Sequence, residues 1–166
     1  MGPEMKSTGE VMGLDVDFAS ALHKAFLGAG YRIPEKGAVL ATVSDKDKAE
    51  ALPLMKKFTD LGFTIWATSG TADFLEANGV EVKRVAKIGH GSPNVIDLIH
   101  NKEVDFVVNS LTKGKQPQRD GFQIRRSAVE FNIPCMTSLD PCRGLLEVIE
   151  RCQAEDVNVK ALLEYV

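Results

Sequence analysis

The sequence predicts an α/β domain of three layers, in which a five-stranded parallel sheet is flanked by helices and one extra helix precedes it. From Gly37 onward, short runs of β-forming residues alternate with stretches of helical periodicity, and turn residues mark each change of period. Most of the β-forming runs are too apolar for a sheet with one face in water. This composition indicates parallel strands that are covered by helices on both sides.

The β-forming runs predict five strands, at residues 38–43, 63–68, 80–85, 104–110 and 133–138. Five predicted helices alternate with them, at residues 46–61, 70–78, 93–101, 123–131 and 141–153. Gly62 and Gly79 follow the first two of these helices, where glycine commonly ends a helix. Pro53 lies within the first one, so that helix either starts later, with Pro53 in its first turn, or is kinked there.

The N-terminal part of the chain predicts a separate helix and an arm. Residues 15–27 carry Phe18, Leu22 and Phe26 at the i, i+4, i+8 spacing of one helical face. Residues 1–13 show no periodicity and predict an extended arm or a linker. We therefore expect an added helix in front of the sheet.

Length and charge limit the possible functions. A chain of 166 residues, 44% of them hydrophobic, can bury one good-sized core and is too short for two typical domains. The 23 acidic and 20 basic residues are interspersed, without the basic stripe that binding to nucleic acid or a membrane surface needs. No apolar run approaches the roughly 18 to 20 residues of a membrane span, and the N-terminus is polar where a signal peptide is apolar. We expect a cytoplasmic protein.

Polar residues follow four of the five predicted strands. They begin with Ser44 after the first strand, Thr68 after the second, Lys87 after the third and Asn109 after the fourth. Ligands of open parallel sheets bind at the carboxyl ends of the strands, so these segments should meet in space.

The segment Thr68-Ser69-Gly70-Thr71 joins a predicted strand to the start of a helix. Free backbone N–H groups and the helix dipole at such a position attract an anion, and the threonine hydroxyls could donate to phosphate oxygens. The alternative is a plain N-cap formed by Ser69 or Thr68. The segment alone does not decide between these interpretations.

Two lysines strengthen the prediction of an anion site. Lys48 and Lys87 fall just past strand ends rather than on an outer helical face, where a phosphate could reach their ammonium groups. The alternative for each is an ordinary solvated lysine on the surface. Asn109 ends the most apolar strand, and its amide could contact a ribose or a base or could anchor the next loop. The long polar stretch at residues 111–121 suits a flap over a ligand. Arg125 and Arg126 open the next predicted helix, where at least one should face an anion or an acidic group.

No complete catalytic or metal-binding set is visible. The sequence suggests no Ser-His-Asp grouping and no metal-ligand spacing, and it lacks the glycine-rich dinucleotide and P-loop motifs. A lone loop histidine such as His90 more often has no catalytic role. Cys135, Cys142 and Cys152 are widely spaced without a CxxC pair, which favours reduced core thiols over disulfides or a zinc site. We expect a binding domain with no catalytic residues and no metal.

These residues resemble the methylglyoxal-synthase-like domain family over residues 37–146. The matching features are Ser44-Asp45-Lys46, the Thr68–Thr71 turn, Lys87 and Asn109. Within that family the chain is similar to the C-terminal regulatory domains of carbamoyl phosphate synthetase large chains. That closer resemblance rests on the segments IRRSA at residues 124–128 and PEMKSTGEVMG at residues 3–13.

The resemblance implies a domain that binds a nucleotide effector such as UMP or IMP, or phosphoribosyl pyrophosphate. It implies phosphate contacts from Lys48, Thr68, Thr71 and Lys87, and contacts to the ribose or base from Asn109. Ser69 and Gly70 complete the phosphate turn, and Thr112 follows Asn109 as a further candidate.

The same resemblance implies a division of the chain and a set of partners. Residues 1–13 would be the closing edge of an ATP-grasp domain or a linker, and residues 14–166 a single regulatory domain. Expected partners are the parent's ATP-grasp domains, its glutaminase small chain and further copies in an oligomer. We expect no cofactor in this segment, whereas the parent chain would use ATP with Mg or Mn to make carbamoyl phosphate.

Two enzymes of the same fold family offer an alternative. Methylglyoxal synthase needs an aspartate in a GGD motif after the third strand, and here Ser92 stands at that position. Without this base, proton abstraction beside a substrate carbonyl has no agent. The IMP cyclohydrolase domain shares the edge after the first strand, but its loop with lysine and histidine after the third strand is missing. The sequence therefore favours regulation over a phosphate-eliminating lyase.

Overall fold

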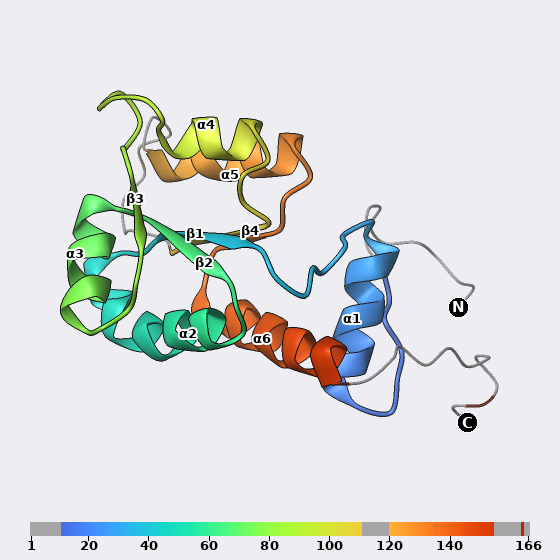
Figure 1. Cartoon of the computed structure of the whole chain (residues 1–166). Coiled ribbons are helices and arrows are strands. Elements are labelled where there is room, and N and C mark those ends of the chain that lie inside the picture. Colours follow the sequence, from blue (N-terminus) through green and yellow to red (C-terminus); the bar gives the residue numbers. More distant parts are fainter. Residues whose placement is uncertain (1–10, 111–119, 155–163, 165–166) are drawn as a thin grey trace.

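The structure is a computed structural model that describes residues 11–110, 120–154 and 164. Figure 1 shows a central sheet between two layers of helices, with one further helix at the side. Within the described residues the sheet has five strands, all parallel, so the predicted three-layer α/β architecture is confirmed.

The strands are shorter than the sequence predicts. They are β1 (Ala38–Thr42), β2 (Thr64–Thr68), β3 (Lys83–Val85), β4 (Phe106–Asn109) and β5 (Cys135–Met136). Their order is β3-β2-β1-β4-β5, which places β1 at the centre. The prediction for β3 began too early because the Val80 N–H bonds back to Leu75 O at 3.0 Å and so belongs to the end of the preceding helix.

All of the predicted helices are present. They are α1 (Phe18–Gly28), α2 (Lys48–Asp60), α3 (Ser69–Ala77), α4 (Val95–His100), α5 (Asp120–Glu130) and α6 (Leu139–Ala154). A 3-10 turn, η1 (Asp45–Asp47), leads into α2. Pro53 lies inside α2, beyond its first turn. The alternative in which the helix starts later, with Pro53 in its first turn, is therefore wrong. Gly62 and Gly79 follow α2 and α3 with φ of 87° and 79°, the left-handed backbone that favours glycine.

Alternate side chains of each strand enter opposite cores. Val39 and Ala41 face the core that β1 shares with α2, α3 and α6, whereas Leu40 between them faces the core with α4 and α5. All three side chains are fully buried. A parallel sheet covered on both faces needs this nearly continuous apolar sequence.

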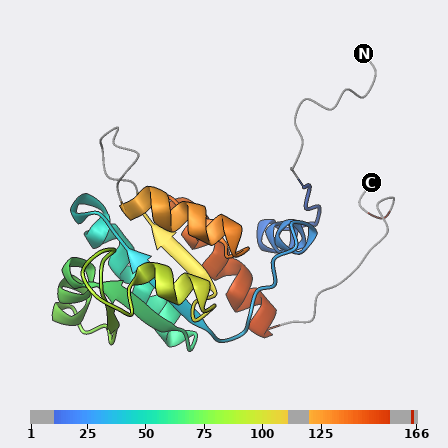
Figure 2. The same ribbon diagram turned by 90° about the horizontal axis from the view of Figure 1, so that it is seen from above.

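The N-terminal helix lies outside the three layers. In Figures 1 and 2, α1 stands beside α6 at the edge of the domain. Its Leu22 and Phe18 pack over Gly144 of α6, where an added Cβ would lie 3.0 Å from the Leu22 side chain. Phe26 packs against the core, but Phe18 remains 64% exposed. The predicted apolar stripe is therefore only partly covered within the described residues.

The strand order creates a switch point beside β1. The chain passes from β1 to β2 on one side and later enters β4 on the other side of β1. The loops that leave the carboxyl ends of β1 and β4 therefore diverge, and open α/β sheets bind ligands in the crevice that results. Among the described residues, no helix is long and apolar enough to cross a membrane.

Candidate anion-binding site

A pocket of about 520 Å³ lies at the switch point. It collects residues that follow β1, β2, β3 and β4 together with the first turns of α4 and α5, so the predicted convergence of strand ends is confirmed. The walls are formed by Thr42, Val43, Ser44, Thr68, Thr71, Lys87, Val95, Asn109, Ser110, Asp120, Gly121 and Ile124.

The N-terminus of α3 opens into this pocket. Thr68 is the N-cap residue, with extended backbone at φ −74° and ψ 155°, but its side chain makes no capping hydrogen bond. The plain side-chain N-cap is therefore not what the structure shows. The hydroxyl of Thr68 and the first backbone N–H groups of α3 are donors at the positive end of a helix dipole.

Thr71 is held differently from Thr68. Its buried hydroxyl accepts a hydrogen bond from the Val43 N–H at 3.2 Å and donates to the Val43 carbonyl at 3.4 Å. Thr71 therefore joins the first turn of α3 to the end of β1. Because its one hydroxyl proton is already donated to Val43, Thr71 stabilises the pocket wall and has no proton left to donate to a ligand.

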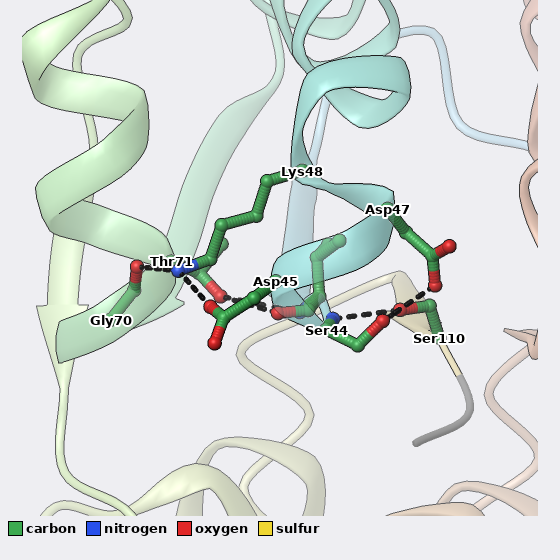
Figure 3. Close-up of polar contacts among 8 residues, drawn as sticks. Ser44, Asp45, Asp47, Lys48, Gly70, Thr71 and Ser110 are labelled. Carbon is green, nitrogen blue, oxygen red and sulfur yellow. Dashed lines mark hydrogen bonds and ion pairs between the residues drawn. The ribbon is translucent and has the colours of Figure 1, made fainter. Parts of the chain in front are cut away.

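Lys48 reaches from the first turn of α2 toward α3, as Figure 3 shows. Its ammonium donates to Gly70 O at 2.6 Å and forms an ion pair with Asp45 Oδ1, also at 2.6 Å. The Lys48 side chain is only 16% exposed, whereas Asp45 is 93% exposed. The hydrogen bond and the charge of Lys48 lower the pKa of Asp45, and the charge of Lys87 adds to this effect.

Lys87 itself lines the pocket from the loop after β3. The ends of this loop are clamped, because Val95 N donates to Ala86 O at 3.1 Å and Ala86 N donates to Pro93 O at 3.3 Å. The clamp holds Lys87 at the pocket rim. His90 of the same loop is exposed and does not line the pocket.

Asn109 anchors the opposite wall. Its side chain is 4% exposed and its Nδ2 donates to Gly121 O at 3.2 Å, which joins the end of β4 to the start of α5. A Cβ at Gly121 would lie 3.2 Å from the Arg125 guanidinium and 3.4 Å from Asn109 Oδ1, so glycine permits this close approach.

The comparison with protein families decides the family. A family model described as MGS-like domain matches residues 50–137, more than half of the chain. The chain belongs to the MGS-like domain family. In fold it is similar to methylglyoxal synthase from Elizabethkingia anophelis NUHP1, with a TM-score of 0.55 and 20% sequence identity. That match covers 69% of this chain and 79% of the other, and at this identity it shows the shared fold alone.

The MGS-like domain brings half of the eight site residues that the sequence predicts into one pocket. Thr68, Thr71, Lys87 and Asn109 line one pocket. Lys48 and Gly70 meet beside it through their hydrogen bond, and Ser69 is exposed in the first turn of α3. Thr112 and most of the predicted flap lie outside the described residues.

A hydroxyl network of this MGS-like domain escaped the sequence reasoning. The Ser44 N–H donates to Ser110 Oγ at 2.8 Å, and the Ser44 hydroxyl donates to Asp47 Oδ2 at 2.6 Å (Figure 3). The hydrogen bond from Ser44 lowers the pKa of Asp47. Ser44 and Ser110 directly follow β1 and β4, so the sequence did show their position at the switch point.

The prediction that Arg125 or Arg126 faces an acidic group is confirmed, but its premise that both residues open a helix is wrong. The helix α5 begins at Asp120, so both arginines lie well inside it and not in its first turn. Arg126 pairs with Glu130 across one turn, on the exposed surface. Gly121 ends a polar stretch that favours a loop, so the helix predicted from residue 123 starts three residues later than α5.

Ser92 does not enter the pocket of this MGS-like domain. Its hydroxyl donates to Asp97 Oδ2 at 3.0 Å, and Asp97 forms a capping box with Asn94 at the start of α4. One carboxylate, that of Asp120, does line the pocket and was missed as a site residue. Among the described residues, no group of three or more His, Cys, Asp or Glu side chains could hold a metal ion.

Proposed function

We propose that this MGS-like domain binds a nucleoside monophosphate as a regulatory effector. The observation that carries the proposal is the pocket at the switch point, where Thr68, Lys87 and the N-terminus of α3 face the same space. A phosphate dianion is best held by such a combination of backbone donors, a hydroxyl and a cation.

The other half of the pocket suits a nucleoside. Val95 and Ile124 are buried apolar residues from α4 and α5 that line it, so a flat base has an apolar surface to contact. Asn109 and Asp120 supply polar groups for ribose hydroxyls or a base edge. The volume of about 520 Å³ lies within the range of small-molecule sites.

The parent protein in this proposal is the large chain of carbamoyl phosphate synthetase. The support is the resemblance of the segments at residues 3–13 and 124–128 to its regulatory domain. ATP, with Mg or Mn, and the glutaminase small chain then belong to the parent, and this segment carries no catalytic residue. UMP is the expected feedback inhibitor, and its occupancy would act on the ATP-grasp domains by favouring one parent state.

A second candidate is a phosphate-eliminating lyase that acts on dihydroxyacetone phosphate. The fold match to methylglyoxal synthase and the Asp120 carboxylate in the pocket favour it. Ser92 disfavours the lyase, because a serine hydroxyl that donates to Asp97 at the start of α4 cannot replace a carboxylate base. Release of methylglyoxal and inorganic phosphate by the purified chain, abolished by Asp120→Asn, would establish the lyase instead.

Calorimetric titration tests the regulatory proposal. The chain is titrated with UMP, IMP, phosphoribosyl pyrophosphate and inorganic phosphate, and the series is repeated with Lys87→Ala. Lys56→Ala is the matched control, because Lys56 is an exposed lysine on α2 outside the pocket. We expect saturable nucleotide binding that weakens by about tenfold in Lys87→Ala and is unchanged in Lys56→Ala.

Absence of nucleotide binding would contradict the proposal for this chain. In that case the remaining function is assembly, which the family resemblance also implies. Light scattering with and without UMP separates the two roles, because an assembly module associates whether or not the nucleotide is present.

A further inference from the structure

The carboxylate of Asp45 lies beside the proposed phosphate site, on the ammonium of Lys48 at the first turn of α3. Asp45 Oδ1 is 2.6 Å from the ammonium of Lys48, and Lys87 is close enough for its charge to act on Asp45. Figure 3 shows the Asp45 side chain beside the contact between Lys48 and Gly70. The two lysines that favour a phosphate thus also favour this carboxylate.

The two partners of the ion pair differ in freedom. Lys48 is largely buried, and its ammonium is fixed by the Gly70 carbonyl at 2.6 Å. Asp45 is 93% exposed and lies in the 3-10 turn ahead of α2, without a further hydrogen bond among the described residues. An exposed carboxylate can rotate into water at little cost, whereas the lysine stays in place.

We propose that Asp45 is a resident counter-anion that occupies Lys48 and must be displaced by an incoming phosphate group. The inference rests on the proposed function, because it concerns the same anion site. Only an anion that interacts with the site more favourably than the Asp45 carboxylate does can then bind. A phosphate dianion gains contacts with Lys48, Lys87 and the α3 N-terminus together, whereas a weak monoanion gains too little to replace a carboxylate already present.

The same geometry explains why the site would not fill with every small anion. Two lysines and a helix N-terminus without a carboxylate would be a general anion trap. Adding Asp45 makes binding an exchange of one anion for another, and the binding free energy is the difference between the two. Removing the charge of Asp45 should therefore strengthen binding rather than weaken it.

The test compares Asp45→Asn with the unchanged chain by calorimetric titration with inorganic phosphate and with UMP. We expect Asp45→Asn to bind both about three- to tenfold more tightly. The same substitution in a Lys48→Ala background should give less than about a twofold gain, because the competitor acts through Lys48. Glu130→Gln is the matched control, since it also removes an exposed, ion-paired carboxylate, far along α5 from the pocket, and should leave affinity unchanged.

A second measurement follows the displacement itself. The side-chain carboxyl carbon of Asp45 is observed by NMR during a phosphate titration. Its resonance should move as the site saturates, and it should move much less in the Lys48→Ala variant. A resonance that stays unchanged while phosphate saturates the site would contradict the displacement.

The outcomes separate this inference from the proposed function. If the unchanged chain binds UMP through Lys87 but Asp45→Asn binds equally or more weakly, the counter-anion role is wrong and the nucleotide site stands. An equal gain in the Lys48→Ala background would also overturn it, because Asp45 would then act by general repulsion. If neither the unchanged chain nor Asp45→Asn binds phosphate or UMP, both proposals fail.

Discussion

The hydroxyl of Thr71 bridges the backbone N–H and carbonyl of Val43, at 3.2 Å and 3.4 Å, and so ties α3 to the end of β1. Thr68, three residues earlier, lines the same pocket but makes no side-chain hydrogen bond at the helix cap. The two threonines of this turn therefore have different roles. Thr71 holds the wall, and Thr68 presents a donor to the pocket.

This division predicts opposite results for two isosteric substitutions. Thr71→Val removes the acceptor of the buried Val43 N–H and should lower the free energy of unfolding by about 1–3 kcal/mol. Thr68→Val should change it by less than about 0.5 kcal/mol but weaken phosphate binding by about tenfold. Urea denaturation and calorimetry measure the two effects. Equal stability losses in both variants would contradict the assignment.

Asn109→Asp should weaken anion binding. The new carboxylate cannot donate to Gly121 O, and it places a negative charge in a nearly buried position on the pocket wall. We expect at least about tenfold weaker binding of phosphate and a loss of about 1–3 kcal/mol in the free energy of unfolding.

Asn78→Asp is the control for this substitution. Asn78 also donates from Nδ2 to a backbone carbonyl, that of Phe74, but it is exposed at the end of α3 and outside the pocket. Its replacement should leave phosphate affinity within about twofold. Unchanged binding by Asn109→Asp would exclude Asn109 from the site.

Most of the fold could be predicted because it follows from local pattern. A continuous apolar run such as Val39 to Ala41 indicates a parallel strand covered by helices on both faces of the sheet. In the structure all three side chains are buried. The boundaries could not be predicted as well. Val80 is apolar and buried, yet its N–H belongs to the end of α3, because a helix cap and a strand start compete for the same backbone group.

The sequence predicts which strand ends form the pocket, but not the contacts that their side chains make. The sequence places Lys48, Thr68 and Thr71 at strand ends, and the topology then brings them to one edge. A hydroxyl can bind a ligand only if it is not already hydrogen-bonded within the protein, and this depends on which atom lies next to it in the folded chain. The bond between Thr71 and Val43 spans elements that pair only in the folded chain. No local pattern shows such a bond.

The cysteines should react slowly in the native protein. Burial raises the pKa of the Cys142 thiol to about 12 and that of Cys135 to about 11, and the thiolate is the reactive form. At pH 7.5 we expect iodoacetamide to modify Cys142 at least about 100-fold more slowly in the native chain than in urea. Mass spectrometry of the peptides gives both rates. Rapid native labelling of Cys142 would contradict its burial in the core.

The contact between α1 and α6 should weaken in mild acid. His23 of α1 lies with Nδ1 3.3 Å from Cys152 Sγ of α6, and burial lowers the pKa of His23 below its usual value of 6.5. The unfolded chain therefore binds a proton more readily than the folded one, so the stabilisation is present above about pH 6.5 and is lost as the pH falls through the folded pKa. Between pH 7.5 and 5.5, the urea midpoint of the unchanged chain should fall further than that of His23→Gln, which cannot take up the proton. Equal shifts in the two proteins would show that protonation of His23 does not destabilise this contact.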